Sequence, residues 1–116
     1  MLRQIHPKLP MRNKTVTIDF YVNGLGFTEI ADYGDYLMLS KDQIEIHFFE
    51  FRDLNPRENY GQVYIRTNDI KDLYQKLIQQ GVAIHPNGAL GTRPWGQQEF
   101  SLLDPDHNLL TFGQPV

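Results

Sequence analysis

The sequence of 116 residues contains no cysteine, which excludes disulfide bonds, thiolate metal sites and cysteine nucleophiles. It also lacks an apolar run close to the ~20 residues of a membrane span, and residues 1–7 have no apolar core of the signal-peptide type. Basic side chains are scarce, with 11 Lys and Arg against 14 Asp and Glu. Clustered positive charge is what nucleic acid needs. We therefore expect a cytoplasmic protein that binds neither nucleic acid nor membranes.

A hydrophobic content of 41% and a charged content of 22% are typical of a soluble globular protein, and the length predicts a single domain over 1–116. Helical spacing of apolar residues predicts a helix over 14–23, and a second one between an N-cap at Asn68 or Asp69 and a stop at Gly81. Alternating apolar residues bounded by turn residues predict strands over 5–11, 27–32, 36–40, 44–49, 60–67, 82–84, 99–103 and 109–112.

These elements repeat a strand–helix–three-strand order twice, in one module over about 1–51 and a second over about 59–113. A shift of 64 places residues 35–39 on 99–103, whereas the helices need a shift of 53, which places Tyr21 on Tyr74. The difference, 64 − 53 = 11, predicts an insertion that carries Trp95, the only tryptophan. Because the first module has no such insertion, contact with a ligand or a second subunit is favoured over a core role for Trp95.

Several short motifs carry a resemblance to a known family: Leu9-Pro10, Phe20-Tyr21, Leu25-Gly26-Phe27, Phe48-Phe49, Pro56, Trp95-Gly96 and Asp104-Pro105-Asp106. With two βαβββ modules, the chain resembles the vicinal-oxygen-chelate superfamily, and within it the bleomycin-resistance proteins. The resemblance implies an α+β fold in which the modules form a cupped mixed sheet. It also implies a homodimer that exchanges its first strands, here through Pro7, Leu9 and Pro10, with a drug-binding cleft at each subunit interface.

Enzymes of the superfamily bind a divalent metal through four strands, and the matching positions here are His6, Glu45 or its neighbour His47, Gln62 and Thr111. Threonine is a poor ligand for a transition metal, so we expect no metal and no other cofactor. The alternative is a three-ligand site made by His6, Glu45 and His47. That site would serve a metal-dependent lyase, isomerase or thiol transferase.

The leading hypothesis is therefore a protein that sequesters a bleomycin-type or similar planar cationic small molecule without chemistry and confers antibiotic resistance; another small ligand remains open. Tyr36 and Trp95, from one subunit or two, could stack on a planar ring. Acidic residues 32, 35, 50 and 53 could serve its cationic tail. Phe100 and Leu102 face the cleft by alternation or fill the core. The predicted ligand-binding residues are Tyr36, Met38, His47, Phe49, Tyr60, Gln62, Tyr64, Trp95 and Phe100.

Overall fold

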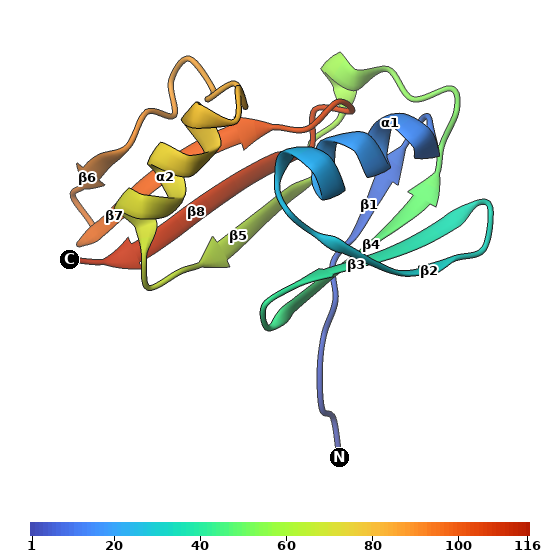
Figure 1. Ribbon diagram of the computed structural model, residues 1–116, viewed down its shortest axis with the longest axis horizontal. Coiled ribbons are helices and arrows are strands. Elements are labelled where there is room, and N and C mark those ends of the chain that lie inside the picture. Colours follow the sequence, from blue (N-terminus) through green and yellow to red (C-terminus); the bar gives the residue numbers. More distant parts are fainter.

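Eight strands and two helices follow one another in the order strand–helix–three strands, twice over, in a computed structural model that describes residues 1–116 (Figure 1). The first module contains β1 (Lys8–Met11), α1 (Lys14–Ile18), its π-helical continuation η1 (Asp19–Gly24), β2 (Thr28–Asp32), β3 (Tyr36–Lys41) and β4 (Ile44–Glu50). A short 3-10 turn, η2 (Pro56–Glu58), leads to the second. That module contains β5 (Gln62–Arg66), α2 (Ile70–Gln79), β6 (Gly91–Arg93), β7 (Gln97–Leu103) and β8 (Leu109–Pro115).

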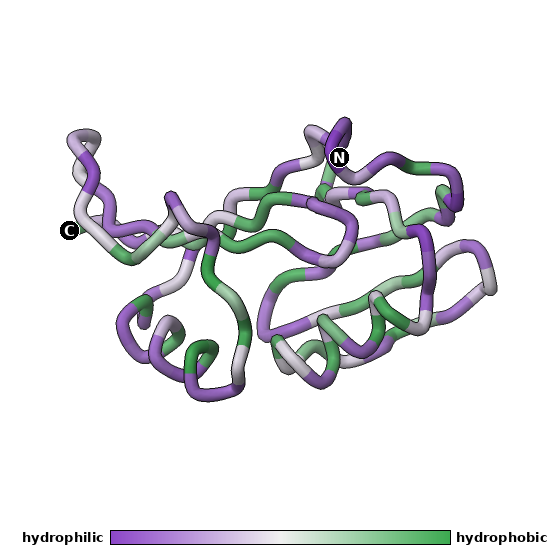
Figure 2. The backbone as a smooth tube through the Cα atoms, turned by 90° about the horizontal axis from the view of Figure 1, so that it is seen from above, coloured by the Kyte–Doolittle hydropathy of each residue, from purple (hydrophilic) through white to green (hydrophobic).

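Each module forms its own four-stranded mixed sheet, with strand orders β1-β4-β3-β2 and β5-β8-β7-β6. The first strand of each module pairs in parallel with the last, and the remaining pairs are antiparallel. The predicted α+β architecture of two βαβββ modules is therefore confirmed. Figure 2 shows both helices on the same side of the strands, which leaves the other face of each sheet without a covering layer. No helix has the length and apolar character needed to cross a membrane.

The hydrophobic core lies between the sheets and the helices because alternate strand residues point to that side. In the first module this face consists of Leu37, Leu39, Ile46 and Phe48, and in the second of Phe100, Leu102, Leu110 and Phe112. The helices contribute Tyr21, Ile70 and Leu77. Burial of one such side chain stabilises the fold by about 1.5–3 kcal/mol.

The two helices differ in whether the predicted N-cap residue makes a capping hydrogen bond. Asn13 caps α1 as its side chain accepts a hydrogen bond from the Val16 amide, at 3.2 Å. Asp69 occupies the N-cap position of α2 without a capping bond from its side chain. The Ile70 amide instead donates to the side chain of Gln114, at 2.8 Å. The predicted cap is therefore supplied from the far end of the chain, a contact that no local pattern encodes.

A buried polar network joins the two modules at the turn between β7 and β8. The hydroxyl of Tyr21 donates to Asp104 at 2.7 Å, and the amide side chain of Asn108 donates to the same carboxylate at 2.8 Å. Asn108 also donates to the carbonyl of Pro10 in β1, at 3.1 Å. Asp106 accepts from the Arg12 guanidinium at 2.6 Å. The motif Asp104-Pro105-Asp106 thus holds the second module against the first.

The predicted strand over 82–84 is wrong, and the strand before β7 is instead β6. Residues 80–90 form a connection in which the amide of His85 donates to the carbonyl of Ser101 and the amide of Ser101 donates to the carbonyl of Gly88, each at 2.9 Å. Part of the insertion therefore lies in this segment. Trp95 lies beyond it, in the tight β6–β7 turn, where Gly96 has a φ of 79° that favours glycine. Gly91 pairs with Glu99 across residues 92–98, whereas Tyr33 bonds to Tyr36, the counterpart of Glu99, across residues 34 and 35 alone. The β6–β7 hairpin is thus also longer than the β2–β3 hairpin, and the prediction that inserted residues surround Trp95 holds for this part.

The alignment of β3 with β7 is off by one residue. Leu37 and Leu39 correspond to Phe100 and Leu102, a shift of 63, whereas Phe48 corresponds to Phe112, a shift of 64. The β7–β8 turn is one residue longer than its counterpart. Because a one-residue slip reverses the face of every side chain in a strand, the prediction that Phe100 faces the cleft is wrong. Its ring packs against Tyr74 of α2, with centroids 5.0 Å apart.

Candidate ligand-binding site

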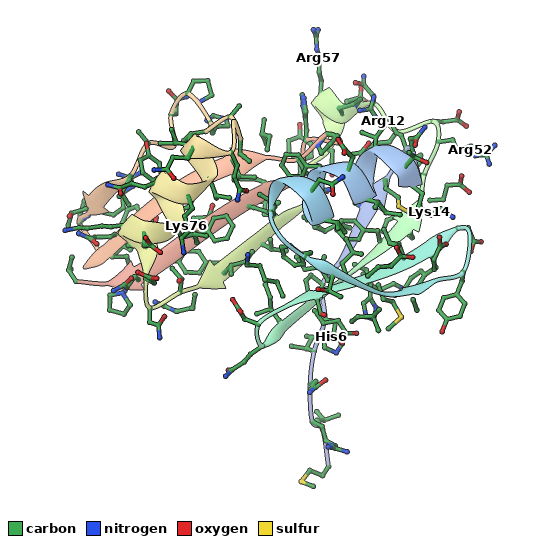
Figure 3. All side chains as sticks on the ribbon, viewed as in Figure 1. His6, Arg12, Lys14, Arg52, Arg57 and Lys76 are labelled. Atoms are coloured by element: carbon green, nitrogen blue, oxygen red, sulfur yellow. The ribbon has the colours of Figure 1, made fainter.

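The uncovered face of the first sheet carries a chain of polar contacts. The hydroxyl of Tyr36 lies 2.7 Å from Nδ1 of His47, whose Nε2 contacts the carboxylate of Glu45 at 2.5 Å. Because a carboxylate only accepts, Nε2 carries the proton and Nδ1 accepts from Tyr36 when His47 is neutral. His6 stacks on His47 with ring centroids 5.1 Å apart. Figure 3 shows His6 where the N-terminal arm meets the sheet.

Aromatic surface lies beside this chain. Tyr36 pairs with Phe49 across β3 and β4, and Met38 pairs with His47 in the same ladder. The Lys8 ammonium lies 5.4 Å from the centre of the Tyr36 ring. Phe49 is 36% exposed, and Tyr36 and Met38 are half-buried. The structure therefore brings the four predicted residues of the first module together into one partly open aromatic surface.

The uncovered face of the second sheet carries a different arrangement, centred on Glu99. Its Oε2 accepts hydrogen bonds from the Tyr64 hydroxyl at 2.6 Å and from the Trp95 indole nitrogen at 2.9 Å. Glu99 itself is only 7% exposed, whereas Trp95 is 64% exposed. The carboxylate therefore holds the indole by its edge and leaves much of the ring open to solvent.

Gly113 on β8 makes this arrangement possible. Tyr64 on β5 must cross β8 to reach Glu99 on β7, and Gly113 pairs with both Arg66 and Glu99 in the sheet. A Cβ atom at Gly113 would overlap the Tyr64 ring. Glycine is thus required here to allow the close approach of a side chain.

The charges around Glu99 favour its ionised form. Burial alone would raise the pKa of Glu99, but the hydrogen bonds from Trp95 and Tyr64, together with the positive charges of Arg93 and Arg66, lower this pKa below the ordinary value. The Arg66 guanidinium lies 5.3 Å from the centre of the Tyr64 ring and donates to Gln97 at 2.7 Å. Glu99 therefore carries a negative charge without a direct ion pair.

Two of the predicted residues lie apart from these contacts. Tyr60 is 84% exposed in the loop before β5, and Gln62 is exposed at the start of that strand. Glu99 was not predicted, because the one-residue slip placed its neighbour Phe100 on this face. A charged residue directly before the apolar part of the predicted strand, four positions after the only tryptophan, was the sequence signal that could have indicated it.

An open groove of about 1450 Å³ lies between the modules, where β5 and α2 of one approach the β3–β4 hairpin and the N-terminal arm of the other. Of the predicted ligand-binding residues only Tyr64 lines it, together with the metal-site candidates His6 and Glu45. Tyr36, Phe49 and Trp95 do not line it. We therefore assign the candidate site to the uncovered sheet faces, where the groups able to stack on and neutralise a ligand are concentrated.

The residues at the family's metal-ligand positions do not fit a metal ion. Both ring nitrogens of His47 are used by Tyr36 and Glu45, and Thr111 is hydrogen-bonded to Ser101 at 2.9 Å. No group of three or more histidine, aspartate or glutamate side chains in the chain is arranged to hold a metal ion. Neutral threonine adds little to such a donor set.

Comparison with known proteins agrees with this architecture. Residues 4–112 match the sequence profile of the glyoxalase/bleomycin resistance protein/dioxygenase superfamily. A bleomycin resistance protein of Geobacillus stearothermophilus is 30% identical over 132 aligned positions, which cover 100% of this chain and 98% of that protein. One of Klebsiella pneumoniae is 27% identical over 115 positions, covering 95% and 90%.

Solved structures superpose along nearly the whole chain. A bleomycin-binding protein in complex with bleomycin has a TM-score of 0.89 at 26% identity, covering 99% of this chain and 100% of the other. A bleomycin resistance determinant encoded on the transposon Tn5 has a TM-score of 0.90 at 26% identity, covering 98% of each chain.

Proposed function

The chain belongs to the glyoxalase/bleomycin resistance protein/dioxygenase superfamily, and from this premise we propose that it binds and sequesters a planar cationic drug of the bleomycin type. Binding takes place in the cytoplasm, without chemical conversion of the drug, and confers resistance by lowering its free concentration. The relatives named as bleomycin resistance proteins and the bleomycin-bound structure support this choice of ligand.

One observation in this chain carries the proposal: a largely exposed indole that is fixed in place. Trp95 is 64% exposed, yet its ring nitrogen is hydrogen-bonded to Glu99 at 2.9 Å. Aromatic stacking contributes about 0.5–1.5 kcal/mol per pair beyond area burial. A ring held in advance loses less conformational entropy when a ligand stacks on it. The anionic carboxylate beside the ring suits a cationic drug.

The proposal includes a homodimer in which the aromatic surface of one subunit (Tyr36, Met38, His47 and Phe49) faces the Trp95 surface of the other. The Trp95 surface consists of Tyr64, Trp95 and Glu99. Both sheets have an uncovered face, and each holds only part of a stacking site. The N-terminal arm supports this assembly, since Met1, Leu2 and Ile5 are almost fully exposed and the arm projects from the body (Figure 1). Leu9 and Pro10 pair with Phe48 and Phe49 of their own module. Pro7 also accepts a hydrogen bond from the His47 amide of its own module, at 3.0 Å. The exchange predicted through Pro7, Leu9 and Pro10 is therefore revised, and the proposal places the exchanged segment at residues 1–6.

A bleomycin titration followed by Trp95 fluorescence and by calorimetry tests the proposed function. We expect saturable quenching with one drug bound per subunit and a dissociation constant unchanged by a chelator. Trp95→Ala should weaken binding at least tenfold in the calorimeter. The absence of both heat and quenching in the wild-type protein would rule out bleomycin as the ligand. Elemental analysis of the purified protein tests the metal-dependent alternative, which stoichiometric zinc, nickel or manganese would favour.

The assembly is tested by removal of residues 1–6. Light scattering after size-exclusion chromatography should give the mass of a dimer for the full chain and a shift toward monomer for the shortened one. Circular dichroism should remain unchanged, because β1 begins at Lys8 and Leu9 is buried in its own module. A full chain that is monomeric at concentrations where it binds drug would contradict the shared site.

A further inference from the structure

The two oxygens of the Glu99 carboxylate have different surroundings. Oε2 accepts from both Tyr64 and Trp95, at 2.6 and 2.9 Å. Oε1 takes part in no hydrogen bond within the chain, and no fully buried side-chain oxygen or nitrogen lacks a partner. Oε1 therefore reaches the surface. The residue as a whole is 7% exposed, so only a small part of it, which includes this acceptor atom, is open to solvent.

No cation within the chain neutralises this carboxylate directly. The ion pairs of the structure involve Glu45, Asp106, Asp32, Glu50 and Asp72, and none involves Glu99. Arg66 is held by Gln97 and lies near the Tyr64 ring, and Arg93, the other nearby cation, donates to the carbonyl of Ala89. A partly covered carboxylate with one open oxygen and no ion-pair partner is suited to a charged hydrogen bond, which is about twice as strong as a neutral one.

The same carboxylate fixes the ring beside which a ligand would stack. Since Trp95 and Tyr64 both donate to Oε2, the indole edge, the phenol and the open Oε1 keep a constant arrangement. Gly113 maintains it by leaving room for the Tyr64 ring. The open acceptor thus stays at a fixed offset from the exposed indole. A ligand that combines a planar ring with a nearby cationic N–H group could use both at once.

We propose that Glu99 determines specificity for the cation of the ligand: Oε2 positions Trp95, and Oε1 accepts a hydrogen bond from a protonated amine, amidinium or guanidinium next to the stacked ring. This inference rests on the proposed binding function and adds to it the chemical class of the recognised group. It predicts that charge on the ligand, and not ring area alone, sets the affinity.

The test compares two probes, a bleomycin with a guanidinium tail and the same drug with that tail removed. Calorimetry gives their dissociation constants for the wild type and for Glu99→Gln, which keeps the shape of the side chain and an acceptor oxygen but has no charge. A charged hydrogen bond corresponds to about a tenfold or larger preference. We expect the wild type to prefer the cationic probe by that factor, and Glu99→Gln to reduce the preference below threefold.

Glu58→Gln is the matched control, because it removes the same charge from an exposed side chain in η2 without hydrogen-bond partners. It should change the preference by less than twofold. Steady-state anisotropy of Trp95 gives a second readout, which should fall in Glu99→Gln as the indole loses its ionic acceptor, and should not change in Glu58→Gln. If Glu99→Gln does not fold, Glu99→Asp keeps the charge but shortens its reach and should lower the preference at least threefold.

The outcomes separate the two proposals. A wild type that binds neither probe overturns the proposed drug binding, and with it the role of Glu99. A wild type that binds the cationic probe and keeps its full preference in the folded Glu99 variant overturns only the role of Glu99. A wild type that binds both probes equally also removes the basis for cation recognition while leaving drug binding in place.

Discussion

The hydroxyl of Tyr21 donates a 2.7 Å hydrogen bond to Asp104, 83 residues further along the chain. Both residues are buried, with Tyr21 fully enclosed. The contact joins the helical segment of the first module to the β7–β8 turn of the second. Asp104 also accepts from the backbone amides of Asp106 and Asn108, at 2.9 Å each. This carboxylate thus organises its own turn and ties that turn to the other module.

Tyr21→Phe should lower the free energy of unfolding by about 1.5–3 kcal/mol, because it removes a hydrogen bond to a buried carboxylate. Urea denaturation followed by circular dichroism measures the change. Tyr33→Phe is the matched control, since Tyr33 is 70% exposed and its hydroxyl has no partner, and it should cost less than ~0.5 kcal/mol. Equal costs for the two substitutions would contradict the structural role of the Tyr21–Asp104 bond.

Alkaline pH should reduce the cost of Tyr21→Phe. Burial, followed by the charge of Asp104 and its hydrogen bond, raises the pKa of Tyr21 well above its ordinary value. Above about pH 10 the unfolded chain ionises this tyrosine while the folded chain does not. The unfolded state then binds fewer protons, so stability falls as pH rises. The difference in unfolding free energy between the wild type and Tyr21→Phe should therefore be smaller at pH 11 than at pH 8. An equal difference at the two pH values would argue against a buried neutral phenol.

Gly113→Ala should displace the Tyr64 ring from Glu99, because a Cβ atom there would overlap it. Overpacking of this kind costs about 1–3 kcal/mol. A double-mutant cycle with Tyr64→Ala isolates the effect. In the Tyr64→Ala background, the alanine at 113 should cost less than half as much in thermal denaturation. If the cost is the same in both backgrounds, glycine is needed at position 113 for the backbone conformation and not for the close approach of the Tyr64 ring.

Phe100→Ala and Tyr36→Ala should separate stability from binding. Phe100 is fully buried against Tyr74 and Phe112, so its removal should cost about 3–5 kcal/mol of unfolding free energy. Tyr36 is half-buried on the uncovered face, and its removal should weaken drug binding more than it lowers stability. Urea denaturation and calorimetry of both variants provide the comparison. A stable Phe100→Ala protein with impaired drug binding would show that Phe100 contacts the ligand and is not a core residue.

The fold could be predicted from the sequence because strand alternation, helix stops and the internal repeat agree with one another. The missing information was local geometry. Val82 and Ile84 have the composition of a strand, but they pack against the core from a connecting segment that does not continue as one. The extra residue in the β7–β8 turn is invisible to an alignment without gaps, and it alone reversed the assignment of Phe100 and Leu102.

The site was less accessible to prediction, because its central residue acts through contacts between strands. Tyr64, Trp95 and Glu99 lie on β5, in the β6–β7 turn and on β7, and their convergence requires Gly113 on a fourth element. Stacking candidates could be identified from residue type alone. The hydrogen bonds that orient them could not, since they depend on which face of β7 is uncovered.

Once β3 and β7 are aligned with the shift of 63, Tyr36 and Glu99 stand at the same position of the duplicated module. One copy presents a phenol there, and the other a carboxylate. If two subunits place these positions on opposite sides of one cleft, one end of the cleft presents a phenol and the other a carboxylate, with Arg66 and Arg93 near the carboxylate. A molecule with a ring at one end and a cation at the other would satisfy both in one direction only. The difference between the two modules at this one position would thus fix the orientation in which the ligand binds. Two modules with the same residue at this position could not do so.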